Sequence, residues 1–96
     1  MSAGQDLIDR LRRTKNGYSQ DDFPEGLTDL GYQFIREVRH GSMFRHPLLA
    51  RHPALDVRMR LAQVVIPKGR ELKPYVAREV LESIELLLEL KKGQDG

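Results

Sequence analysis

Residues 71–91 have the sequence ELKPYVAREVLESIELLLELK, and their apolar side chains recur at the three- and four-residue spacing of a helix. Pro74 falls near the start, where the missing N–H of proline does little harm. Lys91 and Lys92 carry the charge that suits the last helical turn, and Gly93 follows them. The pattern therefore predicts one long C-terminal helix.

Apolar side chains cover more of this helix than one neighbouring layer can bury. On a helical projection, a stripe centred on Ile84 is the predicted core face. A second group lies outside that stripe, and from it we assign four partner-binding residues: Leu72, Val76, Leu86 and Leu90. We expect another protein, or a second copy of the chain, to cover them. The alternative is that the N-terminal helix or the segment 16–30 covers this side.

The residues before this helix have the composition of strands. Residues 32–39 are rich in aromatic and β-branched side chains, and Tyr32 and Phe34 are expected to face the core. Residues 43–45 are expected to pair back on them after a turn. Apolar and charged residues alternate from Leu55 to Leu61, which predicts a strand over 55–66 with one buried face. Two prolines make residues 46–54 a predicted loop.

These elements predict an α+β fold in a single domain. Hairpin-length connections favour an antiparallel sheet of two or three strands, packed on the long C-terminal helix as a small two-layer sandwich. A short amphipathic helix is expected over 5–13. The predicted organisation is an N-terminal arm over 1–20, an α+β domain over 21–92 and a disordered tail over 93–96.

The composition excludes several classes of site. Cysteine is absent, so disulfides, thiolate metal sites and a cysteine nucleophile are excluded. No apolar run exceeds three residues, whereas a membrane-spanning helix needs about 20. Residues 1–10 lack the apolar centre of a signal peptide. We therefore expect an intracellular protein, in the cytoplasm or the nucleus, without a membrane partner.

Charge is segregated along the chain, although the net charge is only +2. Residues 21–30 hold four acidic residues and no basic one, whereas residues 31–70 hold eight basic and two acidic ones. This basic block is expected to attract phosphates or an acidic partner. Its assigned anion or nucleic-acid contacts are Arg39, Arg45, Arg51, Arg58 and Arg60.

Catalytic and metal-binding patterns are weak. The tripeptide Arg39-His40-Gly41 resembles the signature of the histidine phosphatase superfamily, which implies a phosphoryl-accepting histidine. Such enzymes need a much larger α/β domain and a second histidine, so we interpret the tripeptide as a polar turn. His40, His46 and His52 recur every six residues, which is not the spacing of a metal pair on a helix or strand. We expect no enzyme, metal or cofactor.

The sequence thus favours a non-catalytic protein–protein interaction module, or a small subunit of a larger assembly or homo-oligomer. Binding is expected through the second apolar side of the C-terminal helix. The alternative is a nucleic-acid-binding module that uses the basic block 31–70.

Overall fold

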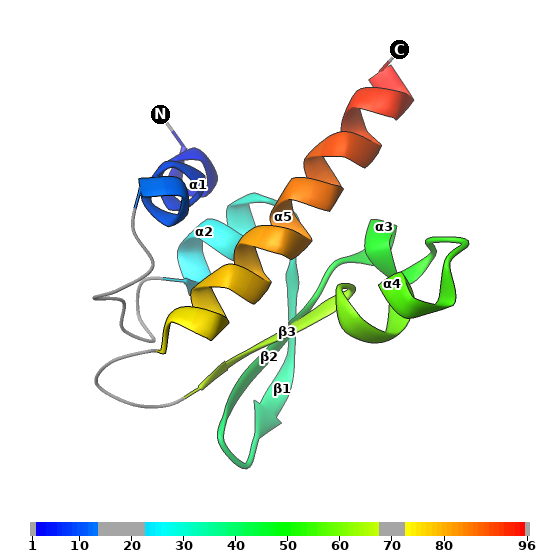
Figure 1. Ribbon diagram of the computed structural model, residues 1–96. Coiled ribbons are helices and arrows are strands. Elements are labelled where there is room, and N and C mark those ends of the chain that lie inside the picture. Colours follow the sequence, from blue (N-terminus) through cyan, green and yellow to red (C-terminus); the bar gives the residue numbers. More distant parts are fainter. Residues whose placement is uncertain (1, 14–22, 68–72, 96) are drawn as a thin grey trace.

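The computed structural model describes residues 2–13, 23–67 and 73–95 of the 96-residue chain. This part holds a three-stranded antiparallel sheet and five helices (Figure 1). In chain order they are α1 Ala3–Arg13, α2 Pro24–Asp29, β1 Gln33–Val38, β2 Gly41–Arg45, α3 Pro47–Ala50, α4 Leu55–Arg60, β3 Gln63–Pro67 and α5 Pro74–Asp95. The α+β fold class expected from the sequence is confirmed. None of the helices described is both long enough and apolar enough to cross a lipid bilayer.

The sheet has the order β1-β2-β3, so β1 and β3 form its two edges. A tight turn at Arg39 and His40 joins β1 to β2, and Val38 pairs with Gly41 directly after it. Gly41 also pairs with Pro67 of β3, and a Cβ atom there would overlap the backbone carbonyl of Ile66. Glycine is required at this position because the two strands approach too closely for a side chain.

Helix α5 crosses one face of the sheet, and the main core lies between them (Figure 1). The side chains of Val80, Ile84 and Leu87 are almost completely buried, as the predicted core stripe requires. The sheet contributes Phe44 and Ile66, from alternate positions of β2 and β3. The helix begins at Pro74 and is described as far as Asp95, within the segment expected as a tail.

Helix α1 is part of the same core. Leu7, Ile8 and Leu11 are each less than 5% exposed, and α1 packs on both α2 and α5. Close contact with α2 needs a glycine, since a Cβ at Gly26 would lie 2.7 Å from a methyl carbon of Leu7. The arm expected over 1–20 therefore contains a helix that the domain buries.

The prediction of a strand over residues 55–66 is wrong for the first half of that segment. Residues Leu55–Arg60 form helix α4, and only Gln63–Pro67 pair with β2. Alternation at every second residue also places apolar residues four apart, as a helix does, so Val57 and Leu61 share one helical face. Leu61 and Val57 are partly buried, whereas Met59 is 70% exposed. The period of two was therefore not a reliable sign of a strand.

The loop predicted over 46–54 contains helix α3, Pro47–Ala50. His46 is its N-cap, because its side chain accepts a hydrogen bond from the backbone N–H of Leu48 at 3.1 Å. Proline suits the first position of a helix, so Pro47 starts this turn instead of preventing it.

Phe34 is the other correction to the predicted core. It packs edge-on against Phe44 at 5.7 Å between ring centroids, yet it stays 54% exposed. Its strand, β1, lies at the edge of the sheet, so a neighbour covers it on one side only. Tyr32, the residue just before that strand, is buried as expected.

Candidate functional site

The two faces of the sheet have different environments. Alternate residues of a strand point to opposite faces, and cross-strand partners share a face. Phe44 and Val64 are buried under α5, whereas Met43 and Val65, their neighbours in sequence, point the other way. We call this other side the outer face: Gln33, Ile35, Arg36, Val38, Met43, Arg45, Gln63, Val65 and Pro67.

A β-bulge adds apolar surface to the outer face. The register between β1 and β2 shifts between Phe34 and Arg36, so Ile35 is the extra residue. In a bulge two residues oppose one on the partner strand, here Ile35 and Arg36 opposite Met43. The side chain of Ile35 is 45% exposed and that of Val65 41% exposed. Both exposed fractions are larger than those expected for apolar side chains on a covered face of a sheet.

The charge of the outer face has one sign. Arg36 and Arg45 lie on it, and none of its residues is acidic. Arg51, which follows α3, lines the same hollow as Arg45 and donates its Nε–H to the carbonyl of Pro47 at 3.3 Å. Among the described residues, no carboxylate forms an ion pair with these three arginines. A partner with acidic groups would supply the missing counter-charges.

A shallow hollow of about 260 Å³ lies where the outer face meets α3. Its lining combines apolar side chains with guanidinium groups: Gln33, Ile35, Arg45, Pro47, Ala50 and Arg51. Helix α3 forms one wall of the hollow, so the residues that place α3 also shape it.

His46 positions α3 because both of its ring nitrogens form hydrogen bonds, one as acceptor and one as donor. Nδ1 accepts from Leu48, so the proton is on Nε2, which donates to the carbonyl of Leu30 at 3.1 Å. The ring is 5% exposed and lies edge-on to Tyr32, with 5.0 Å between centroids. Burial lowers the pKa of His46 below its ordinary value of 6.5; the Leu30 carbonyl opposes this and Lys91 adds to it.

A second buried polar chain ties three elements together. Ser83 of α5 donates to the carbonyl of Leu61 at 2.8 Å, so the hydroxyl of Tyr32 is the donor to Ser83 at 2.7 Å. Burial raises the pKa of Tyr32 to about 12, although the Ser83 bond acts in the opposite direction. Tyr32 is therefore neutral at physiological pH, and these hydroxyls hold the fold together.

The structure places the four assigned partner-binding residues in different environments. Val76 is 3% exposed and belongs to the chain's own core, so a partner cannot reach it. Leu86 and Leu90 are partly buried, and Leu72 lies outside the described residues. Leu86 and Leu90 follow Ser83 by three and seven residues, so they share its flank of the helix, where Ser83 bonds Leu61.

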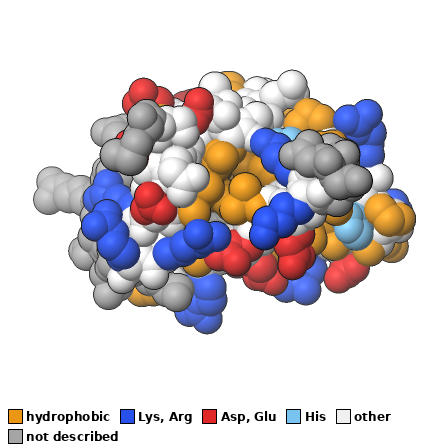
Figure 2. Space-filling view, turned by 90° about the horizontal axis from the view of Figure 1, so that it is seen from above, with side chains coloured by type: hydrophobic (Ala, Val, Ile, Leu, Met, Phe, Trp, Pro, Cys, Tyr) orange, Lys and Arg blue, Asp and Glu red, His pale blue; other side chains and the backbone are white. Residues whose placement is uncertain are grey.

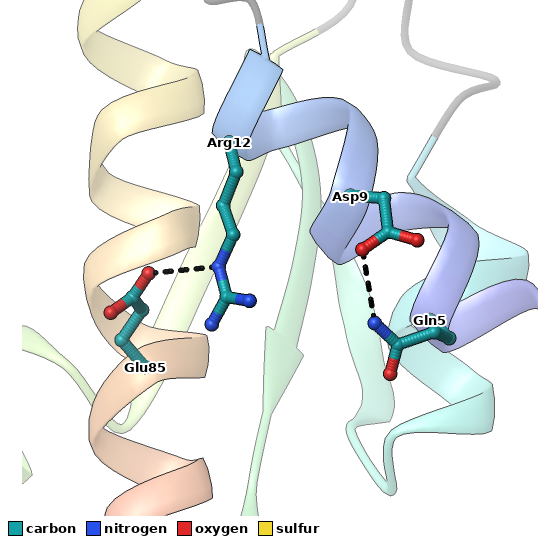
Figure 3. A network of polar contacts seen from close by, with 4 residues as sticks. All are labelled: Gln5, Asp9, Arg12 and Glu85. Atoms are coloured by element: carbon teal, nitrogen blue, oxygen red, sulfur yellow. Dashed lines mark hydrogen bonds and ion pairs between the residues drawn. The ribbon is translucent and has the colours of Figure 1, made fainter.

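Helix α1 covers the opposite flank of α5. Arg12 of α1 pairs with Glu85 of α5 at 3.3 Å, and both side chains are about half exposed (Figure 3). In the same view the amide of Gln5 donates to Asp9 within α1 at 3.0 Å. The N-terminal helix, which is the alternative cover expected from the sequence, thus packs beside Leu86 and Leu90 instead of over them.

The five assigned arginines do not form one surface. Arg45 and Arg51 both line the hollow. Arg39 lies in the β1–β2 turn, and Arg60 is exposed at the end of α4. Arg58 donates to the carbonyls of His52 and Pro53, at 2.8 and 3.3 Å, and so fixes the loop before α4. The sequence assignments omitted Arg36, Ile35 and Val65, which only the register places beside Arg45.

The three histidines also lie in different environments. His40 is exposed in the β1–β2 turn, and His46 is the buried cap of α3. His52 accepts the N–H of Ala54 through Nδ1. In residues 2–13, 23–67 and 73–95, no three His, Asp or Glu side chains come together as metal ligands. The described contacts of His46 and His52 therefore stabilise local structure: His46 caps α3, and His52 binds the backbone of the loop before α4.

The face that carries α1 and the C-terminal part of α5 has mixed charges. Figure 2 shows apolar side chains there between basic and acidic ones. A groove at this place is lined by Arg12, Glu85, Leu88, Glu89, Lys91 and Lys92. Because its lining includes both acidic and basic groups, this groove lacks the single sign of charge that the outer face has.

No protein family model, curated protein or solved structure matches this chain. Function is therefore inferred from the surface of the protein.

Proposed function

We propose that the chain is a non-catalytic interaction module that binds another protein through the outer face of its sheet. One observation carries the proposal: exposed Ile35 and Val65 share a face with Arg36 and Arg45, and Arg51 lines the hollow at its end. Within the part of the chain that the structure describes, none of these arginines has a carboxylate partner, and the outer face has no acidic residue. Arginine and methionine are enriched in protein interfaces, whereas lysine and acidic residues are depleted. The outer face has this composition among its described residues.

This proposal moves the binding surface from α5 to the sheet. Leu86 and Leu90 remain partly accessible, but they pack against the core, and Val76 is enclosed by it. Ile35 and Val65 already expose a large fraction of their side chains, so a partner would remove apolar area from water there. The gain is about 1 kcal/mol for each, because each is about half exposed. Such a gain favours a transient complex.

The same geometry supports a non-catalytic role. Ser83 is buried and donates its proton to a backbone carbonyl, and Ser42 is buried on the inner side of β2. The outer face offers neither a carboxylate nor a hydroxyl nucleophile among its defined residues. An intracellular partner stays part of the proposal, in agreement with the absence of cysteine.

Nucleic acid is the second candidate partner. Arg36, Arg45 and Arg51, which have no carboxylate partner among the described residues, also favour it. Their guanidinium groups would bind phosphates as readily as carboxylates. The outer face has no aromatic side chain on which a base could stack, which weighs against recognition of single strands. A duplex held by its phosphates is the form of nucleic acid that fits.

Affinity capture with two matched variants tests the proposal. Ile35→Glu/Val65→Glu places charges on the outer face, and Leu55→Glu/Met59→Glu makes the same change on exposed positions of α4. We expect the first variant to lose the protein captured by the wild-type chain, and the second to keep it. The reverse pattern would show that the outer face is not the binding surface. A salt-dependent gel shift with duplex RNA or DNA, lost in Arg36→Glu/Arg45→Glu, would favour the second candidate.

A further inference from the structure

We propose that the hollow beside α3 binds an acidic, apolar segment of the partner protein, with a carboxylate between Arg45 and Arg51 and an apolar side chain against Ile35. This inference rests on the proposed function, because it gives the chemistry of the partner at one point of the outer face. Three features of the hollow support it: the apolar lining residues, the two guanidinium groups and the volume.

The apolar part of the lining comes from two elements. Ile35 contributes to it from the bulge in β1, and Pro47 and Ala50 contribute to it from α3. Ile35 remains 45% exposed although it lines a hollow, so its side chain is available for contact. An apolar group of the partner would therefore be buried here with a gain in free energy.

Arg45 and Arg51 supply the charge from the two sides. Arg45 points outward from β2, and Arg51 is the first residue after α3. The bond from Nε of Arg51 to the carbonyl of Pro47 holds its guanidinium group near the hollow. The terminal nitrogens of Arg51 have no hydrogen bond within the described chain. Two guanidinium groups beside apolar lining residues suit a carboxylate next to an apolar side chain.

The size of the hollow argues against a drug-sized ligand that it would have to enclose. Pockets for small molecules hold about 300–1,000 Å³ and enclose most of the ligand. This hollow has about 260 Å³ and is open, so it accommodates one or two side chains of a larger partner. Its position next to β1, one of the two edge strands of the sheet, lets an extended segment continue along that strand.

Fluorescence anisotropy tests this inference with a labelled peptide of alternating Asp and Leu residues, and with a matching Lys and Leu peptide as the charge-reversed probe. We expect the wild-type chain to bind the acidic peptide. We expect Arg45→Glu/Arg51→Glu to bind it about tenfold more weakly or worse and to gain binding of the basic peptide. Arg39→Glu/Arg60→Glu changes the net charge equally, away from the hollow, and is expected to retain most of the binding of the acidic peptide.

Equal losses in the two double variants would overturn the inference, since they would indicate attraction by net charge alone. Thermal unfolding followed by circular dichroism checks that each variant is folded.

Suppose the acidic peptide does not bind, but Ile35→Glu/Val65→Glu still loses the captured protein. The inference then fails and the proposed function stands. If that capture also survives the substitution, both fail. Binding of duplex nucleic acid instead of the peptide, lost in Arg45→Glu/Arg51→Glu, assigns the arginines to phosphates.

Discussion

His46 shows how one side chain links the core to the candidate site. Its Nδ1 accepts the Leu48 N–H that starts α3, and its Nε2–H reaches the carbonyl of Leu30. The bond from the Leu48 N–H requires the neutral ring, because a protonated Nδ1 cannot accept a hydrogen bond. The same residue therefore maintains the wall of the hollow and satisfies a buried carbonyl.

The stability of the protein should depend on the protonation of His46. Its pKa is lowered by burial in the folded state, so the unfolded chain binds more protons below its ordinary pKa of 6.5. The stabilisation is complete above that pH and is lost as pH falls toward the folded-state pKa. We expect the free energy of unfolding, measured with urea, to be smaller at about pH 5.5 than at about pH 7.5.

Two histidine variants locate this effect. Asparagine is a good N-cap that does not titrate, so His46→Asn should reduce the pH dependence. His40→Asn, in the exposed β1–β2 turn, should leave it as in the wild type. The account of His46 is wrong if His40→Asn reduces the pH dependence as much as His46→Asn does.

Helix α4 is the element in which local pattern and structure disagree. A strand over 55–61 would bury every second residue, whereas the structure leaves Leu55 63% and Met59 70% exposed. Val57 is partly buried against the core, and the backbone N–H of Leu61 bonds its carbonyl at 2.9 Å. Packing at one helical position therefore determines this element, not alternation along the whole segment.

Alanine substitutions in α4 distinguish the two structures. We expect Val57→Ala to lower the free energy of unfolding by about 1 kcal/mol, because it removes partly buried methyl groups. Met59→Ala should change it by about 0.5 kcal/mol or less, since the side chain is exposed and alanine favours a helix. Equal losses at both positions, measured by urea unfolding, would instead support the alternating strand.

Elements for which two sequence features agree could be predicted from the sequence. Elements that depend on contacts with other parts of the fold could not. Helix α5 has both helical periodicity and Pro74 at its start, and the β1–β2 hairpin has β-branched residues before a Gly41 turn. Arg45 and Arg51 were recognisable as basic residues. Their position beside Ile35 depends on a bulge and on strand register, which single-sequence patterns do not show.

At the scale of the whole molecule, the helices are distributed unequally about the sheet. Helices α1, α2 and α5 build the core on the inner side, and α3 lies at one end, so the described part of the chain leaves the outer face open (Figure 1). The molecule is correspondingly thin, with extents of 40 × 30 × 19 Å. One side of the sheet carries the core, and the other is the face for which we propose binding.

This division makes α1 necessary for folding. Deleting residues 1–13 would expose the core that Leu7, Ile8 and Leu11 now cover. Their burial contributes about 1.5–3 kcal/mol each, which together is comparable with the stability of a small domain. We expect the truncated chain to lose cooperative thermal unfolding by circular dichroism. Arg12→Ala, which removes only a half-exposed ion pair, should change the stability by about 0.5 kcal/mol or less. Unchanged cooperative melting of the truncated chain would show that α1 is a dispensable arm.

Photo-cross-linking in living cells tests the binding surface most directly. A photoreactive amino acid replaces Val65 on the outer face in one variant and Leu55 on α4 in another, both exposed in the isolated chain. The account predicts a covalent adduct with a partner protein from position 65 and none from position 55. An adduct from position 55 alone would contradict it and move the interface to α4.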